Sequence, residues 1–354
     1  MNVLLTCAGR RNFLMRLFQD ALAGRGHVFA CDSSPNAPAL AEAHASFTVP
    51  PMGKPEYYET LLALCREHGV GMLVSVHDLE LGELARRAPC FAAAGTRVMI
   101  SAPETVALCQ DKWTAFQFLR SCEIPTPATF LSLPAAQRAL ARGLVEFPLL
   151  VKPRWGTSSI GLMRVESERE LELASEWAQV EIRRSILAPL SKTDPTQALI
   201  IQEHVEGHEY GLDVVNDLEG RHVATLARRK LAMRAGNTDR AVSVCDPRLD
   251  RIGRQIGQHL GHCGSLDCDV IVAQDRGYVL DLNPRLGGGY PFSHLAGANL
   301  PAALVAWALD EEPDPAWFRC RPGVLVSKYD GMMVMDEETI SAVPCAMADA
   351  SERT

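Results

Sequence analysis

The stretch SLDCDVIVAQDRGYVLDLNPRLGGGY, residues 265–290, decides the fold that we predict for this chain. Two runs of alternating apolar and polar residues, LDCDVIV and YVLDLN, flank the polar tetrapeptide QDRG, and this pattern is typical of a β-hairpin. We expect Ala273 and Gly277 to close the turn. Side chains alternate along a strand, so Leu280 and Leu282 should lie on the face opposite the polar residues.

The polar side chains of the hairpin should share one face. In the predicted register Asp269 lies opposite Asp281, and Asp267 lies opposite Asn283. Like charges directly across a ladder repel, so the pair needs a positive group between them. Two carboxylates and one amide, with no His or Cys, suit Mg²⁺, which keeps water and substrate phosphates in its other positions. Taken alone, the stretch is equally compatible with a solvated hairpin face.

The composition limits the classes of protein to which this chain can belong. The chain has 354 residues, 47% of them hydrophobic, which is enough for two or three compact units. We find no apolar run of about 20 residues and no signal-peptide core, and we expect a cytoplasmic location and no membrane partner. Eleven cysteines without a CxxC pair indicate a reducing compartment. The net charge of -8 argues against nucleic-acid binding.

Residues 1–100 alternate between buried-type strands and helical patterns, which predicts a parallel α/β domain. The turn CAGRRN has only Gly9 where the dinucleotide fingerprint needs three glycines, so nicotinamide and flavin binding are not expected. The predicted strands are 2–6, 27–31, 71–76 and 97–100, and the predicted helices are 12–23 and 56–68.

Several polar residues follow the strands of this domain. Arg10 and Arg11 stand beside a helix start and could hold an anionic group. Ligands of parallel sheets bind at the carboxyl ends of the strands, where Asp32, His77 and Asp78 are expected. An equally good interpretation is that these residues cap helices and face a domain interface.

A second unit begins near residue 101. Ser101 and Glu104 form a predicted capping box at a helix start. A strand at 147–151 then delivers Lys152 into PRWGTSSIG. The backbone of this glycine-rich flap can surround an anion, but it is not a Walker A loop, because Leu and Met follow Gly161 where Lys and Ser or Thr are required. The candidate phosphate contacts in the flap are Gly156, Ser158 and Ser159.

A strand at 198–203, the connector HVEG and the run EYGLDVV suit an adenine slot. Backbone groups there can read the edge of the base, and Glu209 can accept from ribose hydroxyls. An ordinary strand connection is the alternative. His204 and His208 have the spacing of zinc ligands on a helix, but Gly207 and the flanking strand patterns argue against a helix. The candidate adenine contacts are Gln202, Glu203, His204 and Val205.

Residues 227–244 concentrate positive charge in an otherwise acidic chain. The excess indicates contact with phosphates or with a carboxylate substrate, and a charge-protected strand edge is the alternative. Downstream of this stretch, His259, His262, Cys263 and Cys268 lack a known ligand spacing, and we expect them to pack in the interior. The basic residues are Arg228, Arg229, Lys230, Arg234 and Arg240.

The order of these parts is more informative than any one of them. Lys112, then Lys152 before a glycine-rich loop, then QEHVEGHE, then an acidic strand followed by DLNPR resembles the ATP-grasp superfamily, and within it the synthetase units of the carbamoyl-phosphate synthase large chain. The resemblance covers about residues 101–310. It implies a mixed α/β and α+β fold with a Rossmann-like pre-ATP-grasp domain (1–100), an N-terminal lobe with the phosphate flap (101–205), a C-terminal lobe with the metal site (206–335) and a tail (336–354).

The resemblance also implies roles for individual residues. Lys112 and Lys152 would contact ATP phosphates, and Arg285 would face the γ-phosphate or an acyl-phosphate. The adenine would meet Glu203 and Val205, and the ribose would meet Glu209. The implied Mg²⁺ ligands, which could also take Mn²⁺, are Asp269, Asp281 and Asn283.

The chain departs from the carbamoyl-phosphate synthase pattern at three positions. Asp269 stands where those enzymes have Gln, and Asp281 replaces their Glu and is one methylene shorter. Asp267 replaces the Asn or Arg of some relatives. The segment LGGGYPF, residues 286–292, is predicted to be a flexible turn on the substrate side.

The implied activity is that of a carboxylate-amine ligase. ATP phosphorylates a carboxylate, and an amine then displaces phosphate, with release of ADP and phosphate. The alternatives are a small-molecule kinase or carboxylase of the same fold and a nucleotide-binding regulator without turnover. The expected partners are a small carboxylate and an amine, and a homodimer through the first domain is compatible with the sequence.

Overall fold

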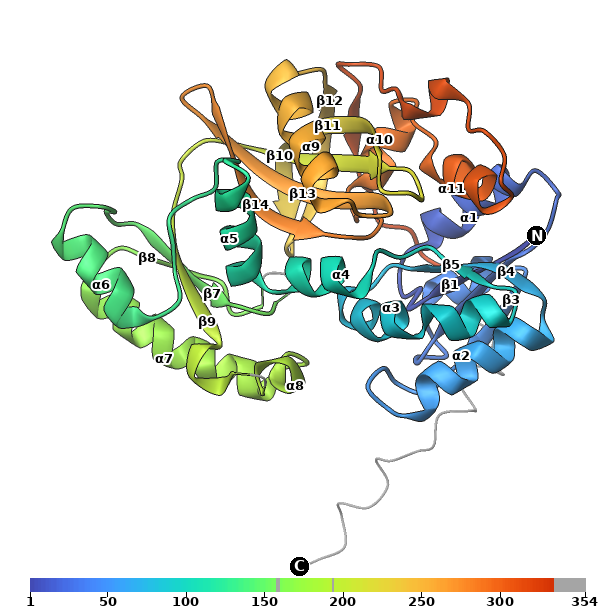
Figure 1. Cartoon of the computed structure of the whole chain (residues 1–354), viewed down its shortest axis with the longest axis horizontal. Helices are drawn as coiled ribbons and strands as arrows, with labels where there is room; N and C mark the ends of the chain where they lie inside the picture. The colour runs from blue at the N-terminus through green and yellow to red at the C-terminus, as the bar shows by residue number, and fades with distance from the viewer. Residues whose placement is uncertain (157–159, 193, 334–354) are drawn as a thin grey trace, which may run out of the picture.

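The computed structural model describes residues 1–156, 160–192 and 194–333. These residues form three sheets, of five, four and six strands, which belong to three regions of the molecule (Figure 1). Ser158 and Ser159 of the predicted phosphate flap lie outside the described residues. The mixed α/β and α+β architecture confirms the predicted fold class.

The first sheet is parallel and has the strand order β3-β2-β1-β4-β5. Apolar runs such as VLL in β1 are buried on both faces because helices cover them. The predicted strands and helices of this unit are confirmed to within a few residues, and β3 and α3 are additional. The elements are β1 Asn2–Thr6, α1 Asn12–Leu22, β2 Val28–Asp32, the 3₁₀ turn η1 Pro38–Glu42, β3 Ala45–Thr48, α2 Glu56–Glu67, β4 Val70–Ser75, α3 Asp78–Ala93 and β5 Arg97–Val98.

Two short helices lead out of this sheet. The predicted capping box at Ser101 is wrong: Ala102 precedes α4, no side chain caps it, and Ser101 Oγ instead accepts from the Cys263 N–H at 3.0 Å. The second helix is capped by Asp111, whose carboxylate accepts from the Trp113 N–H at 3.0 Å. The helices are α4 Pro103–Gln110 and α5 Lys112–Ser121.

The four-stranded antiparallel sheet has the order β6-β9-β7-β8. Leu149, Val151 and Ile201 of this sheet pack with Leu171 and Ala178 of α7. This unit lies at the left of Figure 1, apart from the parallel sheet. Its elements are β6 Thr129–Phe130, α6 Leu133–Ala141, β7 Leu149–Pro153, β8 Met163–Val165, α7 Glu168–Arg184, α8 Ala188–Ser191, the 3₁₀ turn η2 Pro195–Gln197 and β9 Leu199–Glu203.

The six-stranded antiparallel sheet has the order β14-β13-β10-β11-β12-β15 and contains the predicted hairpin as β13 and β14. The amphipathic helix α9 covers one face of it through Leu249, Ile252 and Ile256. The elements are β10 His208–Asn216, β11 His222–Arg234, β12 Asn237–Val244, α9 Pro247–Leu260, β13 Gly264–Ala273, β14 Arg276–Asn283, α10 Tyr290–Leu295, α11 Leu300–Ala308, the 3₁₀ turn η3 Pro315–Phe318 and β15 Leu325–Ser327.

Helix α11 returns to the beginning of the chain. It packs against α1 (Figure 1), and its buried Leu304 and Val305 share one hydrophobic core with Val3 and Leu5 of β1. The last helix thus completes the core of the first sheet. No helix within the described residues is long and apolar enough to cross a membrane.

Candidate functional site

The hairpin places the predicted polar residues opposite each other, although its turn differs from the prediction. Asp269 pairs with Asp281 and Asp267 pairs with Asn283, as expected. The predicted turn is wrong by one position, because Ala273 pairs with Arg276 across a two-residue turn. Gln274 and Asp275 in this turn have φ values of 46° and 65°, as a tight hairpin turn requires.

A β-bulge restores the register between this turn and the site. Val270 pairs with Val279, and the next pair is Asp269 with Asp281, so Leu280 has no partner in the ladder. Leu280 therefore does not share the apolar face as predicted; Val279 and Leu282 are the residues of β14 that are buried in the core.

Lysine side chains neutralise the two opposed carboxylates. Lys112 Nζ, at the start of α5, donates to both carboxylate oxygens of Asp281 at 2.7 and 2.8 Å. Lys230 Nζ, on β11, donates to Asp269 Oδ1 and to Glu209 Oε1, each at 2.6 Å. The positive groups that the paired carboxylates require thus come from two other elements of the fold.

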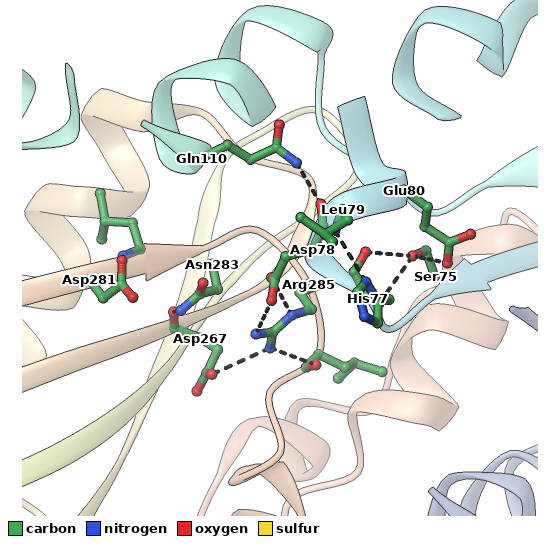
Figure 2. Close-up of polar contacts among 12 residues, drawn as sticks. Ser75, His77, Asp78, Leu79, Glu80, Gln110, Asp267, Asp281, Asn283 and Arg285 are labelled. Carbon is green, nitrogen blue, oxygen red and sulfur yellow. Dashed lines mark hydrogen bonds and ion pairs between the residues drawn. The ribbon is translucent and has the colours of Figure 1, made fainter. Parts of the chain in front are cut away.

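Arg285 connects the hairpin to the parallel-sheet unit (Figure 2). Its Nε and Nη2 donate to the two carboxylate oxygens of Asp78 at 2.6 and 3.0 Å, and its Nη1 donates to Asp267 Oδ2 at 3.5 Å. Asp78 is the first residue of α3. Because the Arg285–Asp78 contact is bidentate, it fixes the orientation of the guanidinium group relative to the hairpin.

A second arginine, Arg228 of β11, is buried behind the carboxylates. Its Nη1 donates to Asp213 Oδ2 at 2.6 Å, and its Nη2 donates to Asp267 Oδ1 at 3.1 Å. The Arg228 side chain is only 2% exposed and that of Asp213 is 0% exposed. Burial, followed by the neighbouring Asp269, raises the pKa of Asp267 to about 6 even though two arginines contact it.

The glycines after β14 are buried contacts of this charge cluster. A Cβ at Gly287 would lie 2.3 Å from Asp267 Cγ, and a Cβ at Gly289 would lie 2.3 Å from Arg228 Nη2. The backbone therefore approaches both charged groups more closely than any side chain would allow. The prediction of a flexible turn is wrong for this part of LGGGYPF, since Leu286, Gly287, Gly289 and Tyr290 are buried.

Lys152 lies on β7 in the facing lobe. Its Nζ donates to the side-chain oxygen of Gln202 on β9 at 2.9 Å. Burial and the nearby Lys112 lower the pKa of Lys152 to about 8, and the charges of Asp281 and Asp269 oppose that shift. The lysines from the two lobes are thus electrostatic neighbours.

Gly156, at the start of the predicted flap, also lies close to this cluster. It lines a small cavity together with Lys112, Asn283 and Asp78. The first residue of the flap is therefore beside the predicted phosphate lysine Lys112 and the predicted metal ligand Asn283.

The predicted adenine segment is an extended connection between β9 and β10. Residues 204–207 lie between these strands, so His204 and His208 do not share a helix, as expected from the strand patterns. The Glu203 carboxylate accepts from the Ala128 N–H at 3.0 Å and ties the segment to β6. The segment leaves β9 and reaches Glu209, which lines the cavity, within a few residues.

The polar residues at the ends of the parallel strands divide between two roles. Asp32 accepts from the Gly9 N–H at 2.8 Å and closes the turn after β1. His77 Nδ1 accepts from the Leu79 N–H at 3.3 Å and caps α3. Asp78 faces the hairpin through Arg285. The cap-and-interface interpretation therefore describes Asp32, His77 and Asp78 in this structure.

The basic stretch on β11 and β12 has more than one role. Arg228 and Lys230 contact the acidic cluster, whereas Arg229 contacts His208 at 3.1 Å, and Arg234 pairs with Asp330 at 2.6 Å near the surface. Of the four residues expected to pack in the interior, His262 is buried, bonds to the Val214 carbonyl at 3.0 Å, and has a pKa lowered by burial to about 4, and Cys268 is also buried. The expectation is wrong for His259, which is exposed at the end of α9.

One cavity of about 230 Å³ is lined by charged and polar residues of this region. Its lining includes the predicted metal, phosphate and ribose residues Asp269, Asp281, Asn283, Arg285 and Glu209. Lys152, Gln202, Glu203, His204 and Val205 belong to the facing lobe and are not among its lining residues. The cavity is also lined by residues that the sequence offered as candidates beside a structural alternative, namely Arg11, His77, Asp78, Arg228, Lys230 and Asp267. Asn237 and Thr238 line it as well, and sequence reasoning did not single them out.

Some of these residues carried a signal in the sequence. The excess of basic residues on β11 includes Arg228 and Lys230. The pattern does not indicate which of the basic side chains point into the cavity. Asp78 follows a predicted parallel strand, where ligands bind, but its partner Arg285 is far away in the sequence. Asp213 lies in an apolar-looking strand, and nothing in the sequence marks it as the buried partner of Arg228.

A hairpin of paired carboxylates that faces a second lobe across a charged cavity, beside a parallel-sheet unit, defines an ATP-grasp architecture. Two family models match the chain: one described as PylC-like, N-terminal domain, over residues 3–99, and one described as ATP-grasp in the biosynthetic pathway with Ter operon, over residues 195–332. The match over residues 195–332 supports the ATP-grasp superfamily that the order of the motifs predicted.

Solved structures of carboxylases have a similar fold. A biotin carboxylase complex with β-γ-ATP from Campylobacter jejuni has a TM-score of 0.72 at 17% identity, over 90% of this chain and 73% of that chain. The biotin carboxylase domain dimer of Hydrogenobacter thermophilus 2-oxoglutarate carboxylase, with MgADP and bicarbonate, has a TM-score of 0.70 at 16% identity, over 88% and 70%. Rhizobium etli pyruvate carboxylase has a TM-score of 0.72 at 16% identity, over 91% of this chain and 29% of that chain.

Proposed function

We propose that the protein is an ATP-dependent carboxylate-amine ligase that works through an acyl-phosphate and releases ADP and phosphate. The observation that carries this proposal is the charge arrangement around one cavity. Lys112 and Lys230 each hold one of the two opposed carboxylates, and Arg285 stands beside them. Phosphoryl transfer to a carboxylate depends mainly on positioning and on neutralising charge, and these groups provide both.

The donor set of the hairpin fits Mg²⁺ or Mn²⁺. Asp269, Asp281 and Asn283 present only oxygen ligands from one sheet face. Mg²⁺ usually takes only one or two carboxylates from a protein and fills its remaining positions with water and substrate phosphates. When bound, the ion neutralises charge on the phosphates.

ATP binding offers Lys112 and Lys230 new partners. In the ligand-free arrangement each lysine is held by a carboxylate, and phosphate oxygens are competing anions. We propose that the two lysines move to the phosphates and release Asp281 and Asp269 to the cation. Lys152 then meets the outer phosphates from the facing lobe, while Gln202, Glu203, His204 and Val205 hold the adenine and Glu209 the ribose.

The chemical step uses no protein nucleophile. A carboxylate oxygen of the substrate attacks the γ-phosphorus, the bond to the β-phosphate oxygen breaks, and ADP leaves. The amine nitrogen then attacks the acyl carbon, the acyl C–O bond breaks with phosphate as the leaving group, and the nitrogen loses a proton. Arg285, fixed by Asp78, lies where it can neutralise charge on the transferred group.

Labelled substrate tests which phosphoanhydride bond is broken. With ¹⁸O in the substrate carboxylate, the proposed route delivers one labelled oxygen to inorganic phosphate and leaves ADP as the nucleotide product. Formation of AMP, or label in AMP, would refute the acyl-phosphate mechanism even if ATP binds. ADP together with a stable phosphorylated product, without released inorganic phosphate, would indicate a kinase.

A carboxylase is the second candidate, because the similar solved structures include carboxylases bound to nucleotide and bicarbonate. Bicarbonate is itself a carboxylate, so the first step has the same chemistry. The two candidates separate in an ADP-release assay: the ligase requires an organic carboxylate together with an amine, whereas a carboxylase responds to bicarbonate. Absence of turnover with either, despite ATP binding, would favour a regulator.

We also propose a homodimer. The Hydrogenobacter thermophilus neighbour is described as a domain dimer, and this chain shares its fold. Light scattering of the purified protein should then give twice the chain mass of 38.7 kDa. A mass of one chain at working concentrations would refute the dimer and leave the ligase proposal unaffected.

A further inference from the structure

We propose that the carboxylate substrate carries a second anionic group, and that Arg10 and Arg11 bind this group in an outer chamber next to the catalytic cavity. The inference rests on the proposed function and adds the class of substrate. It concerns the loop that follows β1 in the parallel-sheet unit, whereas the reacting carboxylate belongs beside Arg285.

The outer chamber adjoins the cavity that contains the acidic cluster. It has a volume of about 590 Å³ and shares Arg11, Asn237, Thr238 and Gly288 with that cavity. A substrate can therefore have one end beside Arg285 and extend past these shared residues toward Arg10. The chamber is large enough for a small organic molecule of several carbon atoms.

Arg11 is a largely buried cation without an acidic partner. In the part of the chain that the structure describes, no carboxylate oxygen lies within 4.0 Å of its guanidinium group. Its side-chain hydrogen bond goes to the Cys7 carbonyl, at 3.4 Å. Burial, followed by the like charge of Arg285, lowers the pKa of Arg11. A buried unpaired charge is costly, and a bound anion would offset that cost.

The other charged residues of the chamber already have partners. Arg234 pairs with Asp330 at 2.6 Å and with Asp239 at 3.1 Å, and Lys328 supplies the second positive charge that balances these two acids. Lys328 Nζ donates to the Gly288 carbonyl at 3.2 Å. Arg10 is exposed and forms no ion pair within 4.0 Å among the described residues.

The remaining charge of the chamber is therefore positive and is concentrated on Arg10 and Arg11. The chamber is also lined by neutral residues, including Phe13 and Asn237. This arrangement suits a molecule with an anion at each end and a short methylene stem between them. A carboxylate and a phosphonate share the chemistry required of the second group, because an arginine binds either one by bidentate hydrogen bonds.

The experiment measures binding to the full chain without nucleotide. Calorimetry compares linear dicarboxylates of four to seven carbons with monocarboxylates of the same length, and adds 3-phosphonopropanoate to distinguish the two kinds of second anion. At least one dianion should bind about tenfold or more tightly than its matched monoanion. A preference for the phosphonate would identify the second group as a phosphate-like anion, and a preference for a dicarboxylate would identify it as a carboxylate.

The variants Arg10→Gln and Arg11→Gln locate the second anion. Each should weaken dianion binding by about tenfold and leave monoanion binding unchanged, because only the second charge loses its partner. Arg16→Gln is the matched control: this arginine is on α1, directly after the loop that carries Arg10 and Arg11, pairs with Glu42 and lines neither cavity, and its side chain is 64% exposed. If Arg11→Gln fails to fold, the exposed Arg10 decides the question.

The proposal is overturned if no dianion binds more tightly than its matched monoanion, or if both variants keep the preference. An ATP assay with hydroxylamine, which traps acyl-phosphates as hydroxamates, distinguishes this failure from failure of the ligase. If monoanions and dianions form hydroxamate equally well, the second-anion site is refuted and the ligase proposal stands. If dianions bind more tightly but no hydroxamate forms, the second-anion site is supported and the ligase proposal is refuted.

Discussion

Lys152 has an electrostatic environment that makes its charge depend on pH near neutrality. Burial and Lys112 lower its pKa from the ordinary 10.5 to about 8. The folded protein therefore releases this proton at a lower pH than the unfolded chain does. Between these two values the unfolded chain binds more protons, so the contribution of Lys152 to stability becomes more favourable as pH rises through that window.

The same shift predicts how ATP affinity depends on pH. A protonated Lys152 should attract the outer phosphates, and the neutral form should not. We expect the ATP dissociation constant to be constant below about pH 7 and to rise above about pH 8, by at most about tenfold per unit. Calorimetry across this range measures it. Lys152→Arg, which keeps its charge, should remove the rise, and an unchanged profile in that variant would place Lys152 outside the phosphate site.

Asp281 is predicted to couple ATP binding to Mg²⁺. Asp281→Asn should remove most of the Mg²⁺ dependence of ATP affinity, and turnover should fall by about 100-fold or more, because a charged ligand is lost. Without Mg²⁺ the variant should lose only about 0.5–1 kcal/mol of stability, since the Lys112–Asp281 pair is partly exposed. Calorimetry and denaturant melts give the two quantities.

The matched control for this variant is on the same hairpin. Asp275→Asn changes an acid in the turn whose side chain is 96% exposed, and it should leave both quantities unchanged. Near-normal Mg²⁺ dependence in Asp281→Asn would contradict the metal assignment.

At the scale of elements, the turn from β14 to α10 is shaped by the charges that it covers. Gly287 contacts Asp267, and Gly289 contacts Arg228, whereas a Cβ at Gly288 would have its nearest neighbour, Asn237 Oδ1, at 3.6 Å. The three consecutive glycines therefore differ in what surrounds them.

This difference predicts an alternating effect of alanine. Gly287→Ala and Gly289→Ala should each lower the free energy of unfolding by about 1–3 kcal/mol, because the added methyl group overlaps a buried charged side chain. Gly288→Ala, in ordinary contact distance, should change it by less than about 0.5 kcal/mol. Urea denaturation of the three variants measures this. Equal effects at all three positions would show that backbone freedom, not the charge cluster, requires these glycines.

At the scale of the whole molecule, one polar and one apolar connection, among others, join the first sheet unit to residues of the second half of the chain. Arg285 reaches Asp78 across the site, and α11 packs its buried face on the core around β1. The polar connection positions the catalytic cavity, and the apolar connection stabilises the unit that supplies Asp78.

The apolar connection predicts that the two ends of the chain unfold together. Val305 is fully buried in the core that contains Val3 and Leu5, so Val305→Ala should cost about 2–3 kcal/mol. Hydrogen exchange should show the loss of protection in β1 as well as in α11. Leu325→Ala, at a position 62% exposed, is the control and should have little effect. Protection lost in α11 alone would refute the coupling.

Much of the fold and the core of the site could be predicted from the sequence. Strand periodicity and helix patterns are local, so the alternating elements of residues 1–100 and the β13–β14 pairing followed from neighbours in the chain. The bulge at Leu280 could not be predicted, because the alternation on either side of it is the same with or without an unpaired residue. The glycine turn was also misread, because its contacts with Asp267 and Arg228 come from distant strands.

The sequence by itself determined the order of parts: a phosphate lysine, a glycine-rich loop, and a hairpin that opposes Asp269 to Asp281. It did so because strand pairing across a short turn depends on residues that are adjacent in the chain. Only the tertiary structure decided which cations compensate these acids and which remain without an acidic partner. Lys230 and Lys112 contact Asp269 and Asp281 from other elements, whereas Arg11 has no acidic partner among the described residues. The reason is that charged groups interact through space, between residues that are far apart in the sequence.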